Sequence, residues 1–190
     1  MNRDHNKTLD AANLKQILSS GIVAEPPSGS KNKIAAVMII VFGDEPMVLM
    51  TERPKTMNHH AGEISFPGGT WEEKDNDLLE TAIRETREEL GIDISRSIIV
   101  GQLKPVTTLN SGFTITPFIA ILDKLPKILT NSEIASVLRI PLLSLLQTIE
   151  NDKDPLHKSI LEMHTFKFET HLIWGASARM LKQIHDKILS

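Results

Sequence analysis

Residues 68–92 read GGTWEEKDNDLLETAIRETREELGI, and they are the most informative part of the chain. Apolar or small side chains recur there at the spacing of one buried helical stripe, at Leu79, Ala82, Ile83, Thr86 and Leu90. This pattern predicts a helix from about Asp77 to Leu90. Gly91 follows where a left-handed C-cap is favoured, and the Pro67–Gly68–Gly69 break comes before the helix.

Three acidic side chains of this helix, Glu85, Glu88 and Glu89, have the spacing i, i+3 and i+4. They therefore project from the same side of the helix, where their like charges repel. A hard divalent cation such as Mg²⁺ removes that repulsion, because it prefers oxygen ligands. Arg84 lies one turn before Glu88 and can pair with it, which would hold a carboxylate in position. For an isolated pair of glutamates, the alternative is a solvated acidic surface.

The segments around this helix read as strands followed by short helices. Strands are expected at residues 34–42, 47–53, 97–107, 113–122 and 163–174. Further helices are expected at residues 14–18 with Asp10 as a cap, at 133–138 with Ser132 as a cap, after Pro141, and at 176–189. This order of elements predicts a mixed, layered α/β domain.

Composition limits the class of protein. A chain of 190 residues favours one domain over residues 1–190, with residues 1–30 forming an N-terminal helix and a connection. The formal net charge of -3 gives no basic surface for nucleic acid, and no apolar run is long enough to span a membrane. The N-terminus does not resemble a secretory signal, and the absence of cysteine suits a cytoplasmic location. The oligomeric state, including a homodimer, stays open.

Residues 68–92 resemble the Nudix box, whose core reads R-E-x-x-E-E-x-G. That core is matched by Arg84, Glu85, Glu88, Glu89 and Gly91. The segment differs from the common box in two ways. Thr86 stands where a small aliphatic residue is usual, and the box is one residue longer, which leaves its upstream acidic position open between Asp75 and Asn76. The resemblance implies the Nudix fold, an α/β/α sandwich around a mixed sheet.

The same resemblance implies a reaction. Glu85, Glu88 and Glu89 would hold Mg²⁺ or Mn²⁺, and one of them is a candidate for deprotonating the attacking water. The metal would lower the pKa of that water and neutralise charge on the diphosphate of a small nucleotide substrate. Gly68 and Gly69 would permit close backbone approach at the loop before the helix.

The stretch before the box, LMTERPKTMNHHAGEISFPGG at residues 49–69, resembles the coenzyme A pyrophosphatase branch of the family. The longer box is also usual in that branch. The match is carried by Leu49, Thr51, Arg53, His60, Gly62, Phe66, Pro67, Gly68 and Gly69. Residues 132–146 (SEIASVLRIPLLSLL) and 171–181 (HLIWGASARML) resemble later segments of the same branch.

This second resemblance implies coenzyme A or an acyl derivative as substrate. Arg53 can bind phosphate bidentately or can be a surface charge at a strand end, and His60 can donate to a phosphate or structure its loop. Asn58 replaces the second Arg of the branch, and Lys55 can substitute for that Arg. Trp174 is expected to pack in the core. The alternatives are hydrolysis of ADP-ribose or another nucleoside diphosphate derivative, and a Nudix module that binds nucleotides without cutting them.

Overall fold

The structure is a computed structural model that describes residues 10–27, 31–56, 62–108, 111–153 and 163–189. The α-helices are α1 (Ala11–Leu18), α2 (Leu78–Leu90), α3 (Leu142–Leu146) and α4 (Gly175–Leu189), and η1 (Arg96–Ile98) is a 3-10 helix. The strands are β1 (Lys33–Phe42), β2 (Met47–Glu52), β3 (Ile64–Ser65), β4 (Gly68–Thr70), β5 (Ile99–Gln102), β6 (Val106–Thr107), β7 (Phe113–Leu122), β8 (Ser136–Pro141), β9 (Glu150–Asn151), β10 (His164–Phe168) and β11 (His171–Ile173).

The main sheet is mixed and is built on β1 and β7, which run parallel from Lys33↔Phe113 to Phe42↔Leu122. The sheet order is β3-β2-β1-β7-β5, with β4 pairing to β1, β6 to β7 and β8 to β2. All of the other strand pairs in this sheet are antiparallel. Strands β9, β10 and β11 form a separate three-stranded sheet.

Strand β1 has different partners along its length, and this positions the glycine pair before α2. Its C-terminal end pairs with β2, as in Val41↔Val48, whereas its N-terminal half pairs with β4. The β4 register joins Ala36 to Gly69 and Val37 to Gly68. The loop that leads into α2 is therefore fixed against a central strand of the sheet.

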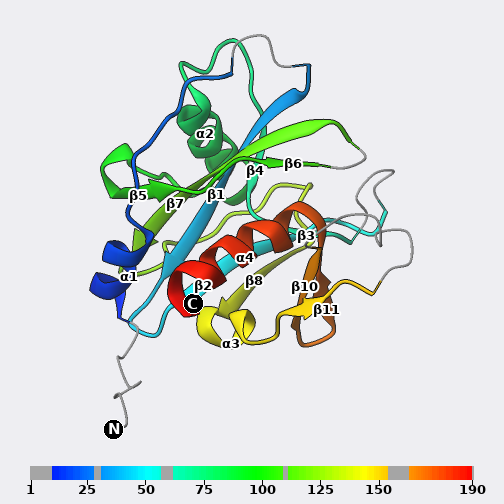
Figure 1. Cartoon of the computed structure of the whole chain (residues 1–190). Coiled ribbons are helices and arrows are strands. Elements are labelled where there is room, and N and C mark those ends of the chain that lie inside the picture. Colours follow the sequence, from blue (N-terminus) through cyan, green and yellow to red (C-terminus); the bar gives the residue numbers. More distant parts are fainter. Residues whose placement is uncertain (1–9, 28–30, 57–61, 109–110, 154–162, 190) are drawn as a thin grey trace, which may run out of the picture.

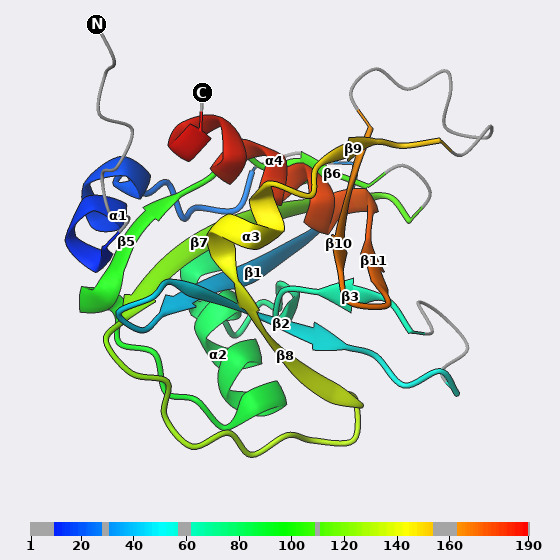
Figure 2. The same ribbon diagram turned by 90° about the horizontal axis from the view of Figure 1, so that it is seen from below.

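Helices cover both faces of the sheet, as Figures 1 and 2 show. Side chains of β1 alternate between the faces, so Ile39 and Val41 join the core beneath α1, α3 and α4, while Met38 and Ile40 join the core beneath α2. These four side chains are almost fully buried, and burial of each contributes about 1.5–3 kcal/mol. The predicted sandwich around a mixed sheet is confirmed.

The helix predicted from residues 68–92 is also confirmed. Its N-cap is Asp77, whose carboxylate accepts a hydrogen bond from the Glu80 amide at 2.8 Å. It ends at Gly91, which has a left-handed backbone with φ of 66° and donates to the Arg87 carbonyl. No helix in the described part of the chain has the length and apolar character needed to cross a membrane.

The helix predicted for residues 133–138 is wrong. A turn over residues 132–133 leads instead to strand β8, which pairs with β2 from Ser136↔Glu52 to Pro141↔Met47. The spacing of Ile134, Val137 and Leu138 imitates a helical stripe. Pairing with the edge of β2 provides hydrogen-bond partners for the backbone N–H and C=O groups of this segment. The tertiary contact therefore overrides the helical pattern of the sequence.

Two of the predicted strands are interrupted. Residues 97–107 are divided among η1, β5 and β6, and residues 163–174 form the β10–β11 hairpin. The first break faces Pro117 in the middle of β7, where Leu103 donates to the Pro117 carbonyl. Proline has no backbone N–H and cannot donate a hydrogen bond back to this segment. The hydrogen-bond ladder with β7 is therefore incomplete at Pro117.

Candidate active site

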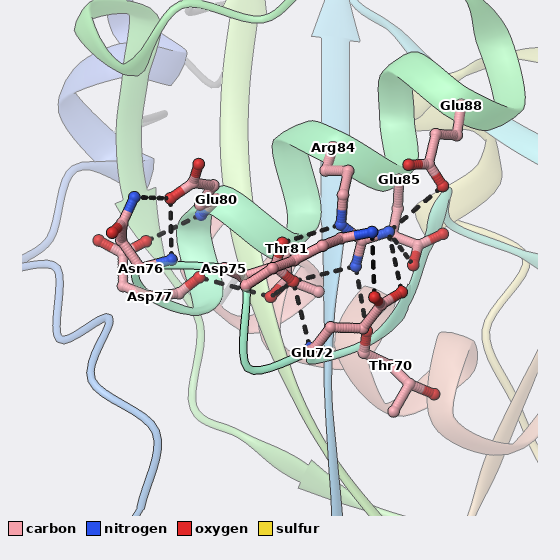
Figure 3. Close-up of polar contacts among 11 residues, drawn as sticks. Thr70, Glu72, Asp75, Asn76, Asp77, Glu80, Thr81, Arg84, Glu85 and Glu88 are labelled. Atoms are coloured by element: carbon pink, nitrogen blue, oxygen red, sulfur yellow. Dashed lines mark hydrogen bonds and ion pairs between the residues drawn. The ribbon is translucent and has the colours of Figure 1, made fainter.

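Arg84 lies at the centre of an ion-pair network on α2 and is only 7% exposed. Its Nε and Nη2 donate to the two carboxylate oxygens of Asp75 at 2.9 and 3.0 Å. Nη1 donates to Glu85 at 2.8 Å and to Glu88 at 3.3 Å, and Nη2 also donates to the Thr70 carbonyl at 3.2 Å. Figure 3 shows these side chains converging on the guanidinium. The pairing of Arg84 with Glu88 was predicted, but Asp75 is the stronger partner.

Asp75 is buried and anchors the loop before α2. It also accepts hydrogen bonds from the Thr81 hydroxyl at 2.9 Å and the Glu72 amide at 3.2 Å. The hydrogen bonds from Arg84 hold the pKa of Asp75 below its usual value. Asn76 bonds to Glu80 on the surface instead. The upstream acidic position that the sequence left open is therefore Asp75, because a carboxylate can accept both Arg84 bonds and an amide cannot.

The three glutamates of α2 lie at different depths. Glu89 is only 5% exposed, and its Oε2 accepts a hydrogen bond from the Gly68 amide at 3.1 Å. Glu85 is partly buried and faces Gly69, whereas the Glu88 side chain is half exposed. The exposure of the three carboxylates therefore increases from Glu89 to Glu85 to Glu88.

Burial strongly affects the ionisation of the two inner glutamates. It raises the pKa of Glu89 to about 7, against the opposing effects of the Gly68 amide and the positive charge of Arg53. Burial likewise raises the pKa of Glu85. The negative charge of Glu133, in the turn before β8, adds to both shifts. Glu133 was not among the residues expected at the site, because its segment has the pattern of a helix rather than of the turn found in the structure.

The glycine pair of β4 leaves no room for side chains. Gly68 has a φ of 153°, and a Cβ on it would overlap the backbone of Ala36 and Val37. A Cβ on Gly69 would lie 2.5 Å from the Glu85 carboxyl group. The close backbone approach expected here is therefore present, and the loop lies directly against the carboxylates.

A cavity of about 670 Å³ begins at this loop and extends to the start of α4. Most of its wall is apolar, including Phe66, Phe113, Met163 and Met180. Among the described residues that line it, the cationic side chains are Arg53 and Arg179, and the acidic one is Glu63. Its volume falls in the range of about 300–1,000 Å³ that is usual for small-molecule sites.

The other residues selected from the sequence have varied positions. Arg53 follows β2 and lines the cavity, whereas Lys55 is exposed and is not part of the cavity wall. His60 and Asn58 lie outside the described residues. The core position expected for Trp174 is wrong, because this side chain is 42% exposed and lines the cavity at the start of α4.

Comparison with known proteins identifies the family. The family model described as "NUDIX domain" matches residues 32–158. The chain belongs to the Nudix family. A protein named "Uncharacterized Nudix hydrolase NudL" from Yersinia enterocolitica is 31% identical over 92% of this chain and 93% of its own length. A protein of the same name from Photorhabdus laumondii is 29% identical over 86% of this chain and 90% of its own length.

Solved structures share the Nudix fold at low sequence identity. A MutT protein from Methanosarcina mazei has a TM-score of 0.58 at 18% identity, covering 85% of this chain and 97% of its own. The Nudix domain of Shewanella oneidensis NrtR, solved with ADP ribose, has a TM-score of 0.58 at 14% identity, covering 86% of this chain and 93% of its own. The α/β/α sandwich described above is therefore the Nudix fold.

Family membership defines the class of reaction. This Nudix protein is a hydrolase of phosphoric anhydride bonds in nucleoside diphosphate derivatives. Enzymes of the family generally use divalent metal ions. The described residues contain no group of three His, Cys, Asp or Glu side chains already arranged around a common point. The donor set nevertheless fits a hard cation, because Glu85 and Glu89 are desolvated and repel each other, and a bound cation favours their ionised forms.

Proposed function

We propose that this Nudix hydrolase cleaves the diphosphate of coenzyme A or an acyl-coenzyme A. Water adds across the P–O–P bond, which gives 3′,5′-ADP and 4′-phosphopantetheine or its acyl derivative. The observation that carries the proposal is the cavity, which adjoins the Gly68–Gly69 loop and has a largely apolar wall that includes Arg53 and Arg179. A ligand with an extended arm and phosphates at separate positions suits such a wall. The branch resemblance over residues 49–69 supports the same substrate.

The side chains of α2 provide the reacting end of the site. In this proposal Glu85, Glu88 and Glu89 hold Mg²⁺ or Mn²⁺ through carboxylate oxygens, and Arg84 keeps Glu85 and Glu88 in position. The bound ion supplies charge neutralisation on the diphosphate and activation of the attacking water. The Gly68–Gly69 loop lets the diphosphate approach the carboxylates closely.

Arg53 provides a cation between α2 and the cavity. Its charge acts on Glu89, and its side chain lines the cavity, so a diphosphate that spans the two regions would lie beside it. A guanidinium can bind such a group bidentately. Lys55 and His60 are proposed as further phosphate contacts, on sequence grounds. The lack of cysteine supports a cytoplasmic location for the enzyme.

The second candidate substrate is ADP-ribose. The Nudix domain of Shewanella oneidensis NrtR was solved with this ligand, and its fold resembles that of this chain. ADP-ribose carries the same kind of diphosphate but no 3′-phosphate and no pantetheine arm. It would therefore bring no pantetheine arm to the apolar wall and no separate phosphate for a second arginine of the cavity.

Product analysis tests the proposal. Purified protein is incubated with coenzyme A and Mg²⁺ or Mn²⁺, and the products are identified by mass spectrometry. We expect 3′,5′-ADP and 4′-phosphopantetheine in equal amounts, with no turnover in excess EDTA. Release of inorganic phosphate alone, or no cleavage of coenzyme A while ADP-ribose is hydrolysed, would exclude coenzyme A as the substrate. Turnover in excess chelator would instead exclude the metal-dependent mechanism.

A further inference from the structure

Arg179 lines the cavity from α4, one turn after the helix begins. Its Nη1 donates a hydrogen bond to the Thr107 carbonyl at the end of β6, at 2.6 Å. Thr107 is itself paired with Thr114 of β7, so the acceptor belongs to the sheet. The guanidinium is therefore held in a defined place, beside the residue that precedes Thr108 of the cavity wall.

The charge of Arg179 has no acidic partner within the described part of the chain. Ion pairs between described residues include those of Arg84, Arg87 and Arg96, but none includes Arg179. A guanidinium has five N–H donors and stays charged at any physiological pH, and the Thr107 bond uses one of these donors. Arg179 therefore presents a fixed positive charge and spare donors to a largely apolar cavity.

Hydroxyl groups line the cavity wall together with Arg179. Thr108 and Ser111 both contribute, and the Ser111 hydroxyl donates to the Thr108 hydroxyl at 2.8 Å. The Thr108 hydroxyl also accepts from the Phe113 amide at 2.8 Å, which fixes it against β7. Ser177 lines the cavity two residues before Arg179. The protons of the Thr108 and Ser111 hydroxyls are used within the wall, because Thr108 also donates to the Phe113 carbonyl at 3.3 Å. A phosphate in this part of the cavity would therefore be bound through the free donors of Arg179.

Arg179 serves a different part of the cavity from Arg53. Arg53 follows β2, whereas Arg179 is hydrogen-bonded to β6, and these two strands are separated in the sheet by β1 and β7. The two arginines therefore approach the cavity from different sides of the sheet. The carbonyl that anchors Arg179 belongs to Thr107, one residue before Thr108 of the cavity wall, so a group bound by Arg179 would lie apart from a diphosphate bound beside Arg53.

We propose that Arg179 is a specificity-determining residue that binds a phosphate monoester of the substrate, separate from the scissile diphosphate. Identification of that group as the 3′-phosphate of coenzyme A rests on the proposed function. The group would accept hydrogen bonds from the free donors of Arg179, while the Thr107 bond keeps the guanidinium in place. The residue thereby favours coenzyme A over the same molecule without its 3′-phosphate.

The first test compares kcat/KM for coenzyme A and dephospho-coenzyme A in wild type, Arg179→Gln and Arg179→Lys. Wild type should prefer coenzyme A, and Arg179→Gln should lower this preference by about 10- to 100-fold, the range expected for a lost charge-assisted hydrogen bond. Arg179→Lys keeps the charge and should retain part of the preference. Lys182→Gln is the matched control, because Lys182 lies one turn later on α4 and pairs with Asp186 at 2.7 Å. It should leave the preference unchanged.

The second test measures binding directly by calorimetry, with 3′,5′-ADP and 5′-AMP as ligands. Wild type should bind 3′,5′-ADP more tightly than 5′-AMP, and Arg179→Gln should remove most of that difference. This arm is informative even if coenzyme A is not cleaved, so failure of the proposed function is distinguishable from failure of this inference. Equal losses on both substrates, or an unchanged affinity difference in correctly folded Arg179→Gln and Arg179→Lys, would overturn the role of Arg179.

Discussion

Arg84 and Arg179 are the same type of side chain in two very different environments. Arg84 is buried and donates to Asp75, Glu85, Glu88 and the Thr70 carbonyl. Arg179 lines a cavity and donates to one backbone carbonyl. A guanidinium whose donors are all used holds its neighbours in place, whereas one with spare donors can bind an incoming anion. The acceptors around an arginine thus indicate its role better than its place in a motif.

The largest expected effect concerns stability and separates the two arginines. Arg84→Gln leaves Asp75 buried without its charge partner, so we expect the free energy of unfolding to fall by about 3–5 kcal/mol. Arg179→Gln removes no ion pair between described residues and should cost less than about 1 kcal/mol. Urea denaturation of both variants measures the difference. Equal losses of stability would show that the two environments do not differ as described.

The next effect concerns the carboxylates that Arg84 helps to position. Glu89→Gln, like Glu88→Gln, should reduce kcat by at least about 100-fold, because a preorganised charge is lost at the reacting centre. Circular dichroism should show an unchanged fold. Glu73→Gln, at an exposed position in the preceding loop, is the control and should keep normal activity. If the Glu88 and Glu89 variants kept near-native rates, the acidic side of α2 would be only a solvated surface.

A smaller effect should appear in the pH dependence of stability. Arg84 lowers the pKa of Asp75 below the unfolded value, so this pair stabilises the fold above that value and the contribution is lost as the pH falls through the folded pKa. Arg84→Gln lacks this contribution. The difference in unfolding free energy between wild type and Arg84→Gln should therefore shrink as the pH is lowered from about 5 to about 3. A constant difference over that range would contradict the role given to the pair.

The smallest expected effect concerns position 58, where this sequence has an asparagine instead of a positively charged side chain. Asn58 stands where the coenzyme A pyrophosphatase branch has an Arg, and it lies outside the described residues. Asn58→Arg should raise kcat/KM for coenzyme A by about two- to fivefold, an amount typical of an exposed charge pair. The gain should be greatest at low salt, where exposed charges are least screened. A similar gain for dephospho-coenzyme A would assign the new charge to the diphosphate rather than to the 3′-phosphate.

Local signals in the sequence were sufficient to predict helix α2. Its apolar stripe and its Gly91 terminus were predicted and lie within one segment, and the structure has both, while Asp77, expected as the first helical residue, is the N-cap. The strand at residues 113–122 was likewise predicted with its observed bounds. Such elements are predictable because the physical causes of their formation are adjacent in the chain.

Long-range contacts explain what the sequence could not show. Strand β8 depends on the open edge of β2, about 85 residues earlier, so its own pattern suggested a helix. Trp174 has a large aromatic side chain of the kind usually found in a core. It nevertheless lines a cavity together with residues of β1, β4 and β7. The role of Asp75 depends on its hydrogen bonds to Arg84, nine residues later, and the sequence alone left this position open between Asp75 and Asn76. That Arg179 has no acidic partner among the described residues can be known only when the positions of its neighbours are known.

The most direct test of the account is the steady-state kcat/KM for coenzyme A, measured beside ADP-ribose and diadenosine polyphosphates with the same metal. The cavity with its two separate arginines predicts that coenzyme A has the highest value, by at least about tenfold, which corresponds to about 1.4 kcal/mol of additional transition-state stabilisation. An equal or higher value for ADP-ribose would contradict coenzyme A as the substrate and would leave the Nudix hydrolase activity in place.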